Sequence, residues 1–414
     1  MNAIASVVIV GGGIAGVTVA RELRAGGFAG GLTIVEGEPA CYDRPPLTKA
    51  AFVEGASLES LAFATPEAYA EQRIDIATDV RAIAVEPGSA GGAGRVRLAD
   101  GRVLEADAIV LATGVRARPA SFPGGDLAEV GVLRDYRDAV RVRALARPGS
   151  TILVVGAGLI GAELTSGLVA LGARVVLVDP QPTPGVAVLG ETLARCLHAM
   201  HAAHGVEVRR AAVTSVAKRA GGVLVALDDG TSVEADAVVV GAGIAVDPAL
   251  AGSAGLADPA AGGSIVVDAA GRTAVPGIWA AGDATWRRDE AGSLAPCAGH
   301  WEAARLDGAA VAADILGLPM PPRGADWYWS DRYGAHVEVV GRLVGDGVEV
   351  VRWAQPDRPA AVFRIADGLL VGAASIDDPM TVRAARRLID QRIPLTEAQL
   401  ADPGVRLRDL LRSA

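Results

Sequence analysis

A glycine pattern that occurs twice constrains the fold of this chain more than any other feature. Each copy is an apolar run of strand character, then three glycines, then a segment of helical character. The copies lie 145 residues apart, with glycines at Gly11, Gly13 and Gly16 and at Gly156, Gly158 and Gly161. In such a unit the first glycine makes a tight turn, the second lets a pyrophosphate approach the main chain, and the third lets helix and strand pack closely. One copy would be weak evidence in a chain with 52 glycines, but two copies behind β-branched runs strongly predict two dinucleotide cradles.

Each cradle has a carboxylate at the expected distance. Glu36 lies 20 residues after Gly16, and Asp179 lies 18 residues after Gly161, each at the end of a second apolar run. A carboxylate in this position accepts hydrogen bonds from ribose hydroxyls. The helix that follows each glycine turn points its positive end at the phosphates. Both units are therefore predicted to be complete.

A second repeat, at an offset of 129 residues, supports the duplication. Leu98, Asp100, Gly101, Glu105, Ala106 and Asp107 recur as Leu227, Asp229, Gly230, Glu234, Ala235 and Asp236. In both copies alternating apolar residues flank an Asp-Gly turn, which predicts a hairpin, and a buried strand follows, at 109–111 or 238–240.

These patterns predict an α/β protein with two Rossmann-like dinucleotide-binding domains, the second inserted into the first, and an α+β C-terminal domain. The first domain is expected at 1–113 and 247–320, the second at 114–246 and the third at 321–414. A strand at 264–268 should belong to the resumed first domain. The third domain is expected to have strands near 335–340, 349–353, 361–364 and 370–375 and a helix over 381–391.

The composition limits the classes of protein and the kinds of partner that are expected. Hydrophobic residues make up 51% of the chain and charged residues 21%, which excludes intrinsic disorder. A net charge of −9 argues against general binding to nucleic acid or anionic lipid. No apolar run has membrane-spanning length, and the first residues lack the basic start of a signal peptide. Cys41, Cys196 and Cys297 form no dithiol motif, so a cytoplasmic protein without disulfides is expected.

Several motifs together resemble those of the oxygenase-coupled NADH:ferredoxin reductases. They are Gly-Gly-Gly-Ile-Ala-Gly at 11–16, Arg-Pro-Pro-Leu-Thr-Lys at 44–49, Ala-Thr-Gly at 112–114, Gly-Ala-Gly-Leu-Ile-Gly-Ala-Glu at 156–163 and Gly-Ile-Trp-Ala-Ala-Gly-Asp at 277–283. The resemblance implies FAD and NADH as cofactors and hydride transfer to flavin N5. It implies that single electrons then pass to an acidic two-iron ferredoxin, which serves a monooxygenase or a ring-hydroxylating dioxygenase. A monomer or weak dimer is expected.

The resemblance also implies roles for individual residues. Lys49 and Glu163 would pair near flavin N5 as the catalytic residues. Glu38 is an alternative to Glu36 as the ribose ligand. The expected cofactor-binding residues are Gly11, Gly13, Ile14, Ala15, Gly16, Glu36, Arg44, Lys49, Val80, Ala112, Thr113, Gly114, Gly156, Gly158, Ile160, Gly161, Glu163, Asp179, Gly243, Gly282, Asp283, Trp301 and Trp329. Because Asp179 would repel a 2′-phosphate and no arginine lies in 180–184, NADH is preferred over NADPH.

Structural interpretations of the same residues remain open. Lys49 is one of only two lysines in the chain and could lie on a solvated loop. Glu163 could simply complement the dipole of its helix. Trp301 and Trp329 could be ordinary packing residues.

Two further clusters are interpreted as structural. His198, His201 and His204, near Cys196, are expected to be surface histidines beside a helix end at Gly205, and no metal site is predicted. Arg383, Arg386 and Arg387 recur at helical spacing, either as a docking face for an acidic ferredoxin or as a solvated helix face.

Two other functions are alternatives. Cys41 follows the second strand, where single-cysteine NADH oxidases, peroxidases and coenzyme A disulfide reductases carry a redox thiol, but its flanking sequence differs from theirs. A redox-sensing flavoprotein similar to apoptosis-inducing factors is the other alternative.

Overall fold

The computed structural model describes residues 4–88, 94–289 and 291–412, which fold into two compact units. The first unit takes in 1–46, 56–116 and 244–323, and the second takes in 47–55, 117–243 and 324–414. The strands β8 (Arg116–Ala117) and β17 (Ile244–Ala245) lie where the chain leaves the first unit for the second time and where it returns. In the described part of the chain, no helix is long and apolar enough to cross a membrane.

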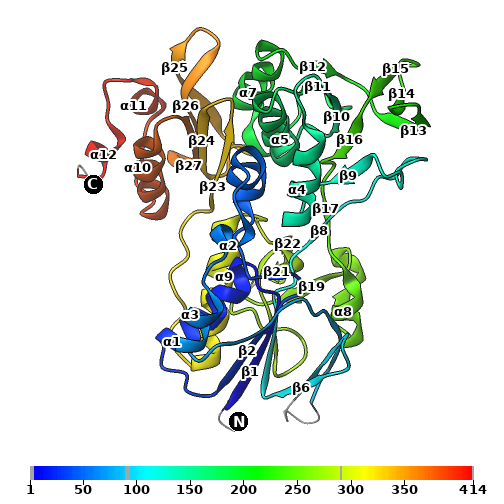
Figure 1. The fold of residues 1–414 in the computed structure, drawn as a ribbon. Coiled ribbons are helices and arrows are strands. Elements are labelled where there is room, and N and C mark those ends of the chain that lie inside the picture. Colours follow the sequence, from blue (N-terminus) through cyan, green and yellow to red (C-terminus); the bar gives the residue numbers. More distant parts are fainter. Residues whose placement is uncertain (1–3, 89–93, 290, 413–414) are drawn as a thin grey trace. The chain divides into compact units, whose positions relative to one another are not determined.

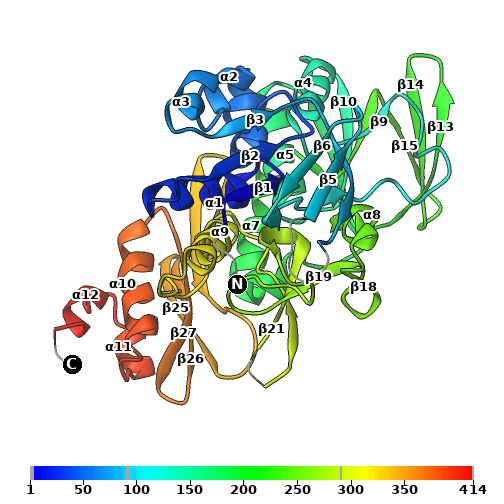
Figure 2. The ribbon, with the colours of Figure 1, turned by 90° about the horizontal axis from the view of Figure 1, so that it is seen from below.

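The first unit is built on a parallel five-stranded sheet with the order β20-β7-β1-β2-β3. Strand β1 alternates its side chains between two cores, with Val7 and Ile9 on one face and Val8 and Val10 on the other. Helices α1 (Ile14–Ala25) and α9 (Trp301–Leu316), which lie side by side in Figures 1 and 2, cover the first face. The second face is covered by an antiparallel sheet of β4 (Ala82–Glu86), β5 (Gly94–Leu98) and β6 (Val103–Ala106). The parallel strands are β1 (Ser6–Val10), β2 (Gly31–Val35), β3 (Asp75–Ala77), β7 (Ala108–Leu111) and β20 (Ile278–Ala280).

The other elements of the first unit extend this arrangement. The expected strand at 264–268 is β19, but it joins a separate four-stranded sheet, β18-β19-β21-β22, and not the parallel one. The helices are α1 (Ile14–Ala25), α2 (Leu58–Leu61), α3 (Pro66–Glu71), α8 (Pro248–Ser253) and α9 (Trp301–Leu316). The remaining strands are β4 (Ala82–Glu86), β5 (Gly94–Leu98), β6 (Val103–Ala106), β18 (Ala257–Asp258), β19 (Ser264–Val267), β21 (Thr285–Arg288) and β22 (Leu294–Pro296).

The second unit repeats the plan with a parallel sheet of order β12-β11-β10-β16-β9. The hairpin predicted at the second Asp-Gly turn is present as β14 and β15, as its counterpart is in β5 and β6. The strands are β9 (Val130–Val132), β10 (Thr151–Val155), β11 (Arg174–Val178), β12 (Glu207–Arg209), β13 (Val213–Arg219), β14 (Gly222–Leu227), β15 (Ser232–Ala235) and β16 (Ala237–Val240). The helices are α4 (Tyr136–Leu145), α5 (Leu159–Ala170), α6 (Val186–Leu189) and α7 (Glu191–Ala203).

The C-terminal part of the second unit is an antiparallel sheet of order β23-β24-β27-β26-β25. One face packs on α10 to α12 and the other on α6 and α7, and Figure 2 shows α10 alongside β27. The four predicted strands and the predicted helix are present, whereas β23 had not been expected as a strand. The elements are β23 (Trp327–Arg332), β24 (Ala335–Gly341), β25 (Val348–Gln355), β26 (Arg358–Ala366), β27 (Leu369–Ile376), α10 (Pro379–Asp390), α11 (Glu397–Ala401) and α12 (Leu407–Leu410).

The predicted fold class is thereby confirmed: both cradles are Rossmann-like, and an α+β region follows them. The domain boundaries at 113/114, 246/247 and 320/321 stay a prediction.

Candidate functional site

The first glycine cradle lies between β1 and α1. Gly11 has a φ of +110°, and a Cβ on it would collide with the carbonyl oxygen of Ala112. A Cβ on Gly16 would collide with the carbonyl oxygen of Gly11, so the helix can approach the strand only with glycine there. Around Gly13, by contrast, a Cβ would meet no atom of the described residues within 4 Å. Because no side chain of the described chain caps α1, its first backbone N–H groups can bind an anion.

The second cradle, between β10 and α5, has the same construction. Gly156 has a φ of +95° and packs against the carbonyl of Gly241, while Gly161 packs against the carbonyl of Gly156. Gly158 again faces open space, and α5 also begins without a side-chain cap in the described chain. Both cradles therefore fit the pyrophosphate of a dinucleotide.

The two carboxylates predicted to complete the cradles occupy matching positions. Glu36 accepts hydrogen bonds from the backbone N–H groups of Gly12, at 2.6 Å, and Glu38, at 3.0 Å. Asp179 accepts from the backbone N–H groups of Ala157 and Gln181, both at 2.8 Å. Each carboxylate thus binds the middle of its glycine turn and keeps lone pairs for ribose hydroxyls. Burial raises the pKa of Glu36, although its backbone hydrogen bonds oppose the shift.

Glu38, the alternative ribose ligand, is committed to other partners. Its carboxylate accepts from the Tyr42 hydroxyl at 2.5 Å and from the Arg44 guanidinium at 2.7 Å. The Arg44 guanidinium also lies 5.2 Å from the centre of the Tyr42 ring. The geometry favours Glu36 over Glu38 as the carboxylate of the cradle, and it places Arg44 beside Glu38.

The remaining first-unit residues lie around the same turn. Ala112 is buried against Gly11, and Thr113 and Gly114 continue from it at the end of β7. Val80 is buried, and its N–H donates to the carbonyl of Glu36 at 3.2 Å. Ile14 and Ala15 form the first turn of α1. A Cβ on Gly282 would meet the side chain of Ala15 at 3.2 Å, so the Gly282–Asp283 turn packs against the start of α1.

Asp307 is a buried residue that sequence reasoning missed. It lies on α9 with a side chain 5% exposed, and it forms ion pairs with Arg287 and, at 2.6 Å, with Arg323. Its carboxylate also accepts from the Cys297 thiol at 3.2 Å and, weakly, from the N–H of Gly282 at 3.4 Å. Asp307 therefore holds the turn that presents Asp283. An aspartate in the middle of a mostly apolar helix was the available signal.

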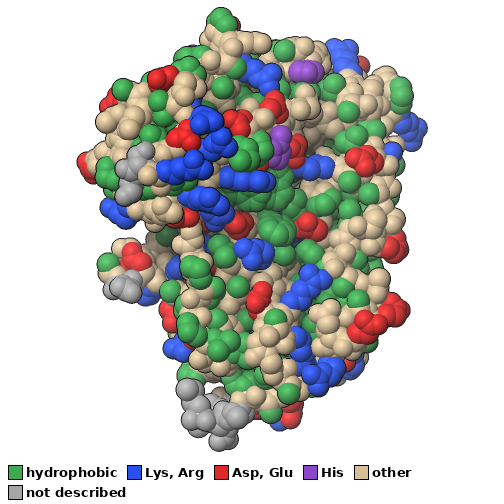
Figure 3. All heavy atoms as spheres, turned by 90° about the vertical axis from the view of Figure 1, so that its left-hand side faces the viewer, with side chains coloured by type: hydrophobic (Ala, Val, Ile, Leu, Met, Phe, Trp, Pro, Cys, Tyr) green, Lys and Arg blue, Asp and Glu red, His purple; other side chains and the backbone are tan. Residues whose placement is uncertain are grey.

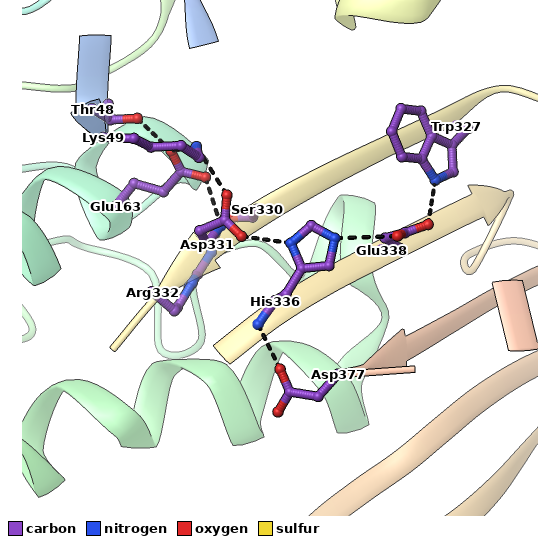
Figure 4. Close-up of polar contacts among 10 residues, drawn as sticks. All are labelled: Thr48, Lys49, Glu163, Trp327, Ser330, Asp331, Arg332, His336, Glu338 and Asp377. Carbon is purple, nitrogen blue, oxygen red and sulfur yellow. Dashed lines mark hydrogen bonds and ion pairs between the residues drawn. The ribbon is translucent and has the colours of Figure 1, made fainter. Parts of the chain in front are cut away.

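The Lys49–Glu163 pair lies within the second unit (Figure 4). Lys49 Nζ lies 2.7 Å from Glu163 Oε2 and 3.4 Å from Asp331 Oδ2. Glu163 also accepts from the Thr48 hydroxyl at 2.6 Å and from the backbone N–H of Asp331 at 2.9 Å. The expected pairing is present, and Thr48 and Asp331 are further members of this cluster to which the sequence pattern assigned no role.

The segment that carries Lys49 is fixed to the second unit. It continues as a single π-helical turn, Ala50–Glu54. The Arg143 side chain, from α4, donates to the backbone carbonyls of Phe52 and Val53. The Phe52 ring fills the space above Gly167 of α5, where a Cβ would come within 2.8 Å of it. Lys49 and Glu163, far apart in sequence, are thus held against one helix.

The two predicted tryptophans, and two residues near the second cradle, are placed as follows. Trp301 opens α9, and its indole N–H donates to Asp43 at 2.7 Å. Trp329 lies on β23, stacked on Trp327 with ring centres 5.0 Å apart, on the same face of the strand as Asp331. Ile160 is exposed in the first turn of α5, and Gly243, with a φ of +101°, follows β16.

Cys41 is buried beside the first cradle. Its sulfur lies 2.3 Å from where a Cβ on Gly12 would be. Burial, reinforced by the charge of Glu36, raises the pKa of the thiol to about 12. A thiol held protonated at neutral pH is a poor nucleophile. All three cysteines are free.

The position of His201, on α7, corrects the sequence interpretation of the histidine cluster. His201 is not a surface residue: it is fully buried and its Nδ1 lies 2.7 Å from the Tyr333 hydroxyl. Burial lowers the pKa of His201 to about 3. The expected surface position failed because α7 presents this side chain to the C-terminal region of the same unit, a contact that helical spacing cannot reveal. In the described part of the chain, no group of three or more His, Cys, Asp or Glu side chains could hold a metal ion.

Comparisons with known proteins agree with this geometry. A family model described as pyridine nucleotide-disulphide oxidoreductase matches residues 5–306, and a reductase C-terminal model matches residues 327–411. The biphenyl dioxygenase system ferredoxin–NAD(+) reductase component of Paraburkholderia xenovorans is 31% identical, over 99% of this chain and 98% of the relative. Putidaredoxin reductase of Pseudomonas putida is 30% identical, over 100% and 98%.

Solved structures give the same result. The crystal structure of the covalent putidaredoxin reductase–putidaredoxin complex matches with a TM-score of 0.91 at 29% identity, covering 100% of this chain and 99% of that chain. The chain is therefore an oxidoreductase that works with flavin and NAD(H). It belongs to the oxygenase-coupled NADH:ferredoxin reductases, within the pyridine nucleotide-disulphide oxidoreductase family.

Proposed function

We propose that this chain takes electrons from NADH by way of bound FAD and delivers them singly to a two-iron ferredoxin that serves an oxygenase. FAD, when bound, supplies the step between a two-electron hydride donor and a one-electron acceptor. The observation that carries the proposal is the Lys49–Glu163 pair at 2.7 Å, because it sets an ammonium beside the helix of the second cradle. The absence of a cysteine pair in the sequence fits electron transfer without a dithiol relay.

The first cradle is proposed to hold FAD. The glycine turn and the start of α1 would bind the pyrophosphate, Glu36 the adenosine ribose and Asp283 the ribityl hydroxyls. Trp301 is a proposed neighbour of the flavin ring and is held by Asp43. Val80, Ala112, Thr113 and Gly114 would line the same site.

The second cradle is proposed to hold NADH. The start of α5 would bind the pyrophosphate, with Ile160 and Gly243 at its edge. Asp179 would accept from the 2′-hydroxyl of the adenosine ribose, and its negative charge would repel the 2′-phosphate of NADPH. We therefore propose a preference for NADH.

Lys49 and Glu163 are proposed to act at the hydride step. Glu163 is held by the Thr48 hydroxyl and the Asp331 N–H, so its carboxylate fixes the position of the Lys49 ammonium. A fixed positive charge stabilises negative charge that develops beside it without reorganising at the moment of reaction. Trp329, on the face of β23 that carries Asp331, is the second proposed neighbour of the flavin.

An arginine-rich face of the C-terminal region is the proposed docking surface for an acidic ferredoxin. Figure 3 shows basic side chains gathered on this face. Arg383 and Arg387, both exposed on α10, line a groove of about 750 Å³. Four more arginines line the same groove: Arg352, Arg406, Arg408 and Arg412. Complementary charge would raise the association rate and make it sensitive to salt. Arg386, half-buried, is not part of the lining.

We also propose a location, an oligomeric state and a division into domains. A cytoplasmic protein fits three free cysteines, and a monomer or weak dimer is proposed without binding to nucleic acid. The division into domains at 1–113, 114–246, 247–320 and 321–414 is likewise proposed, on the strength of the two repeats.

Stopped-flow absorbance tests the proposed function. The FAD-loaded protein is mixed anaerobically with NADH, and a purified two-iron ferredoxin is added in a second mix. Bleaching within milliseconds to seconds, followed by reoxidation on adding ferredoxin, is expected. Slow bleaching that leaves a persistent charge-transfer band, insensitive to ferredoxin, would instead indicate a redox sensor.

A further inference from the structure

The Lys49 ammonium lies between two carboxylates and is closer to one of them than to the other. Its Nζ is 2.7 Å from Glu163 Oε2 but 3.4 Å from Asp331 Oδ2. The other oxygen of Asp331 is engaged elsewhere: Oδ1 lies 2.6 Å from Nδ1 of His336, on β24 opposite β23. Asp331 thus stands between Lys49 and an imidazole (Figure 4).

The His336 ring has a carboxylate at both nitrogens. Nδ1 faces Asp331, and Nε2 lies 3.2 Å from Glu338 Oε1. The Glu338 carboxyl group is itself held by the indole N–H of Trp327 at 2.7 Å. A carboxylate only accepts hydrogen bonds, so both ring nitrogens can donate only when the imidazole is protonated.

Three further charged residues lie near the His336 ring or its strand partner. The backbone N–H of His336 donates to Asp377 at 2.8 Å, and Asp377 is paired with Arg358 at 2.7 Å. Arg332, next to Asp331 on β23, is buried and donates to Ser330 at 3.0 Å. Burial acts to lower the pKa of His336, but the hydrogen bonds and charges of Asp331 and Glu338 outweigh it and raise the pKa above 6.5.

We propose that His336 is a positioning residue for Lys49: as an imidazolium it holds Asp331 Oδ1, so that the ammonium of Lys49 stays on Glu163. When the ring loses its proton, one nitrogen turns a lone pair toward a carboxylate, and Asp331 loses a cationic partner. The Asp331 carboxylate then competes better for Lys49, and the ammonium shifts from Glu163 toward Asp331. The state of the Lys49–Glu163 pair is thereby linked to a proton on a different strand.

Selective labelling can test this link because the chain has only two lysines and five histidines. The FAD-loaded full-length protein is labelled with ¹³C-lysine and ¹³C-histidine, and the Lys49 Hε–Cε and His336 ring signals are followed by NMR over pH. Lys218 is the internal control, because it lies on β13 and pairs with Glu129. Lys49→Met assigns the lysine signals.

Three variants make the result decisive. In the wild type, the Lys49 signal is expected to move with the same midpoint as His336, while Lys218 stays still over that range. His336→Arg keeps a positive charge at every pH, so Lys49 should stay at its low-pH position. His336→Gln should hold Lys49 near its high-pH position. His204, an exposed histidine that follows the last residue of α7, is hydrogen-bonded to the Met200 carbonyl. His204→Gln should leave the wild-type curve unchanged.

The inference would be overturned if the Lys49 signal does not shift over the pH range in which His336 titrates. It would also be overturned if the Lys49 signal still shifts over that range in His336→Gln and His336→Arg. Its consequence for hydride transfer rests on the proposed function, whereas the NMR measurement requires no turnover. A flat rate of flavin reduction across the His336 midpoint, with a Lys49 signal that does move, would count against the proposed role of Lys49 and not against the link to His336.

Discussion

The two lysines of the chain allow one prediction to be made with a matched control. Both lysines form an ion pair with a glutamate, but in different surroundings. The Lys49 side chain is 28% exposed and Glu163 is 10% exposed, whereas Lys218 is 59% exposed beside Glu129. Lys49→Met removes a charge-assisted hydrogen bond, and of the donors to Glu163 in the described residues those of Thr48 and Asp331 remain.

The expected cost follows from burial. Losing a hydrogen bond to a charged, largely buried carboxylate costs about 1.5–3 kcal/mol of unfolding free energy. The Lys218–Glu129 pair is more exposed than the Lys49–Glu163 pair, with side chains 59% and 20% exposed. Its loss should therefore cost less, under about 1 kcal/mol, and Lys218→Met should be milder. Urea unfolding of both FAD-loaded variants, compared through their midpoints and slopes, measures the difference.

The same two variants separate an effect on stability from an effect on catalysis. Lys49→Met should slow flavin reduction by NADH at least about tenfold, which corresponds to about 1.4 kcal/mol in the barrier, while the bound FAD per chain stays the same. Lys218→Met should leave the rate unchanged. Equal losses of stability in the two variants, or an unaltered rate in Lys49→Met, would refute the reasoning from burial and contact.

Three other substitutions test separate parts of the account. Asp179→Ala should raise the KM for NADH and narrow the difference between NADH and NADPH; an unchanged ratio in steady-state assays would mean that Asp179 does not read the ribose. Cys41→Ser should leave ferredoxin reduction intact because the thiol is buried and protonated, and a collapse of activity would favour the single-cysteine oxidase or reductase alternative. His201 has its pKa lowered to about 3 in the folded protein, so the unfolded chain binds its proton first, and stability falls as pH drops below about 6.5, at up to about 1.4 kcal/mol per pH unit. The unfolding free energy of His201→Gln should therefore fall less than that of the wild type between pH 7.5 and 5 in urea titrations.

Local constraints made the two cradles predictable from sequence. Gly11 and Gly156 have positive φ values, and Gly16 and Gly161 have no room for a Cβ. Each cradle therefore requires glycines at fixed positions within six consecutive residues. Glu36 and Asp179 follow at a spacing that one strand–helix–strand unit fixes. The pairing of Lys49 with Glu163 was accessible only through resemblance to a known family.

What the sequence did not reveal depends on contacts between distant segments. Nothing in 327–332 distinguishes a strand from a loop beside a cofactor, because Trp and Tyr serve both. The burial of His201 depends on Tyr333, which is 132 residues away. From the sequence Asp307 looks like an ordinary polar helix residue, because its ion pairs with Arg287 and Arg323 form only in the folded chain.

The proposed function requires that NADH reduces the bound FAD and that the electrons then leave singly. Anaerobic titration of the purified protein, followed by its visible spectrum, tests it most directly. A yellow protein should be bleached by one equivalent of NADH per FAD, and its colour should return with two equivalents of oxidised two-iron ferredoxin. A preparation that stays colourless after incubation with FAD, or a yellow one that NADH does not bleach, would contradict the account.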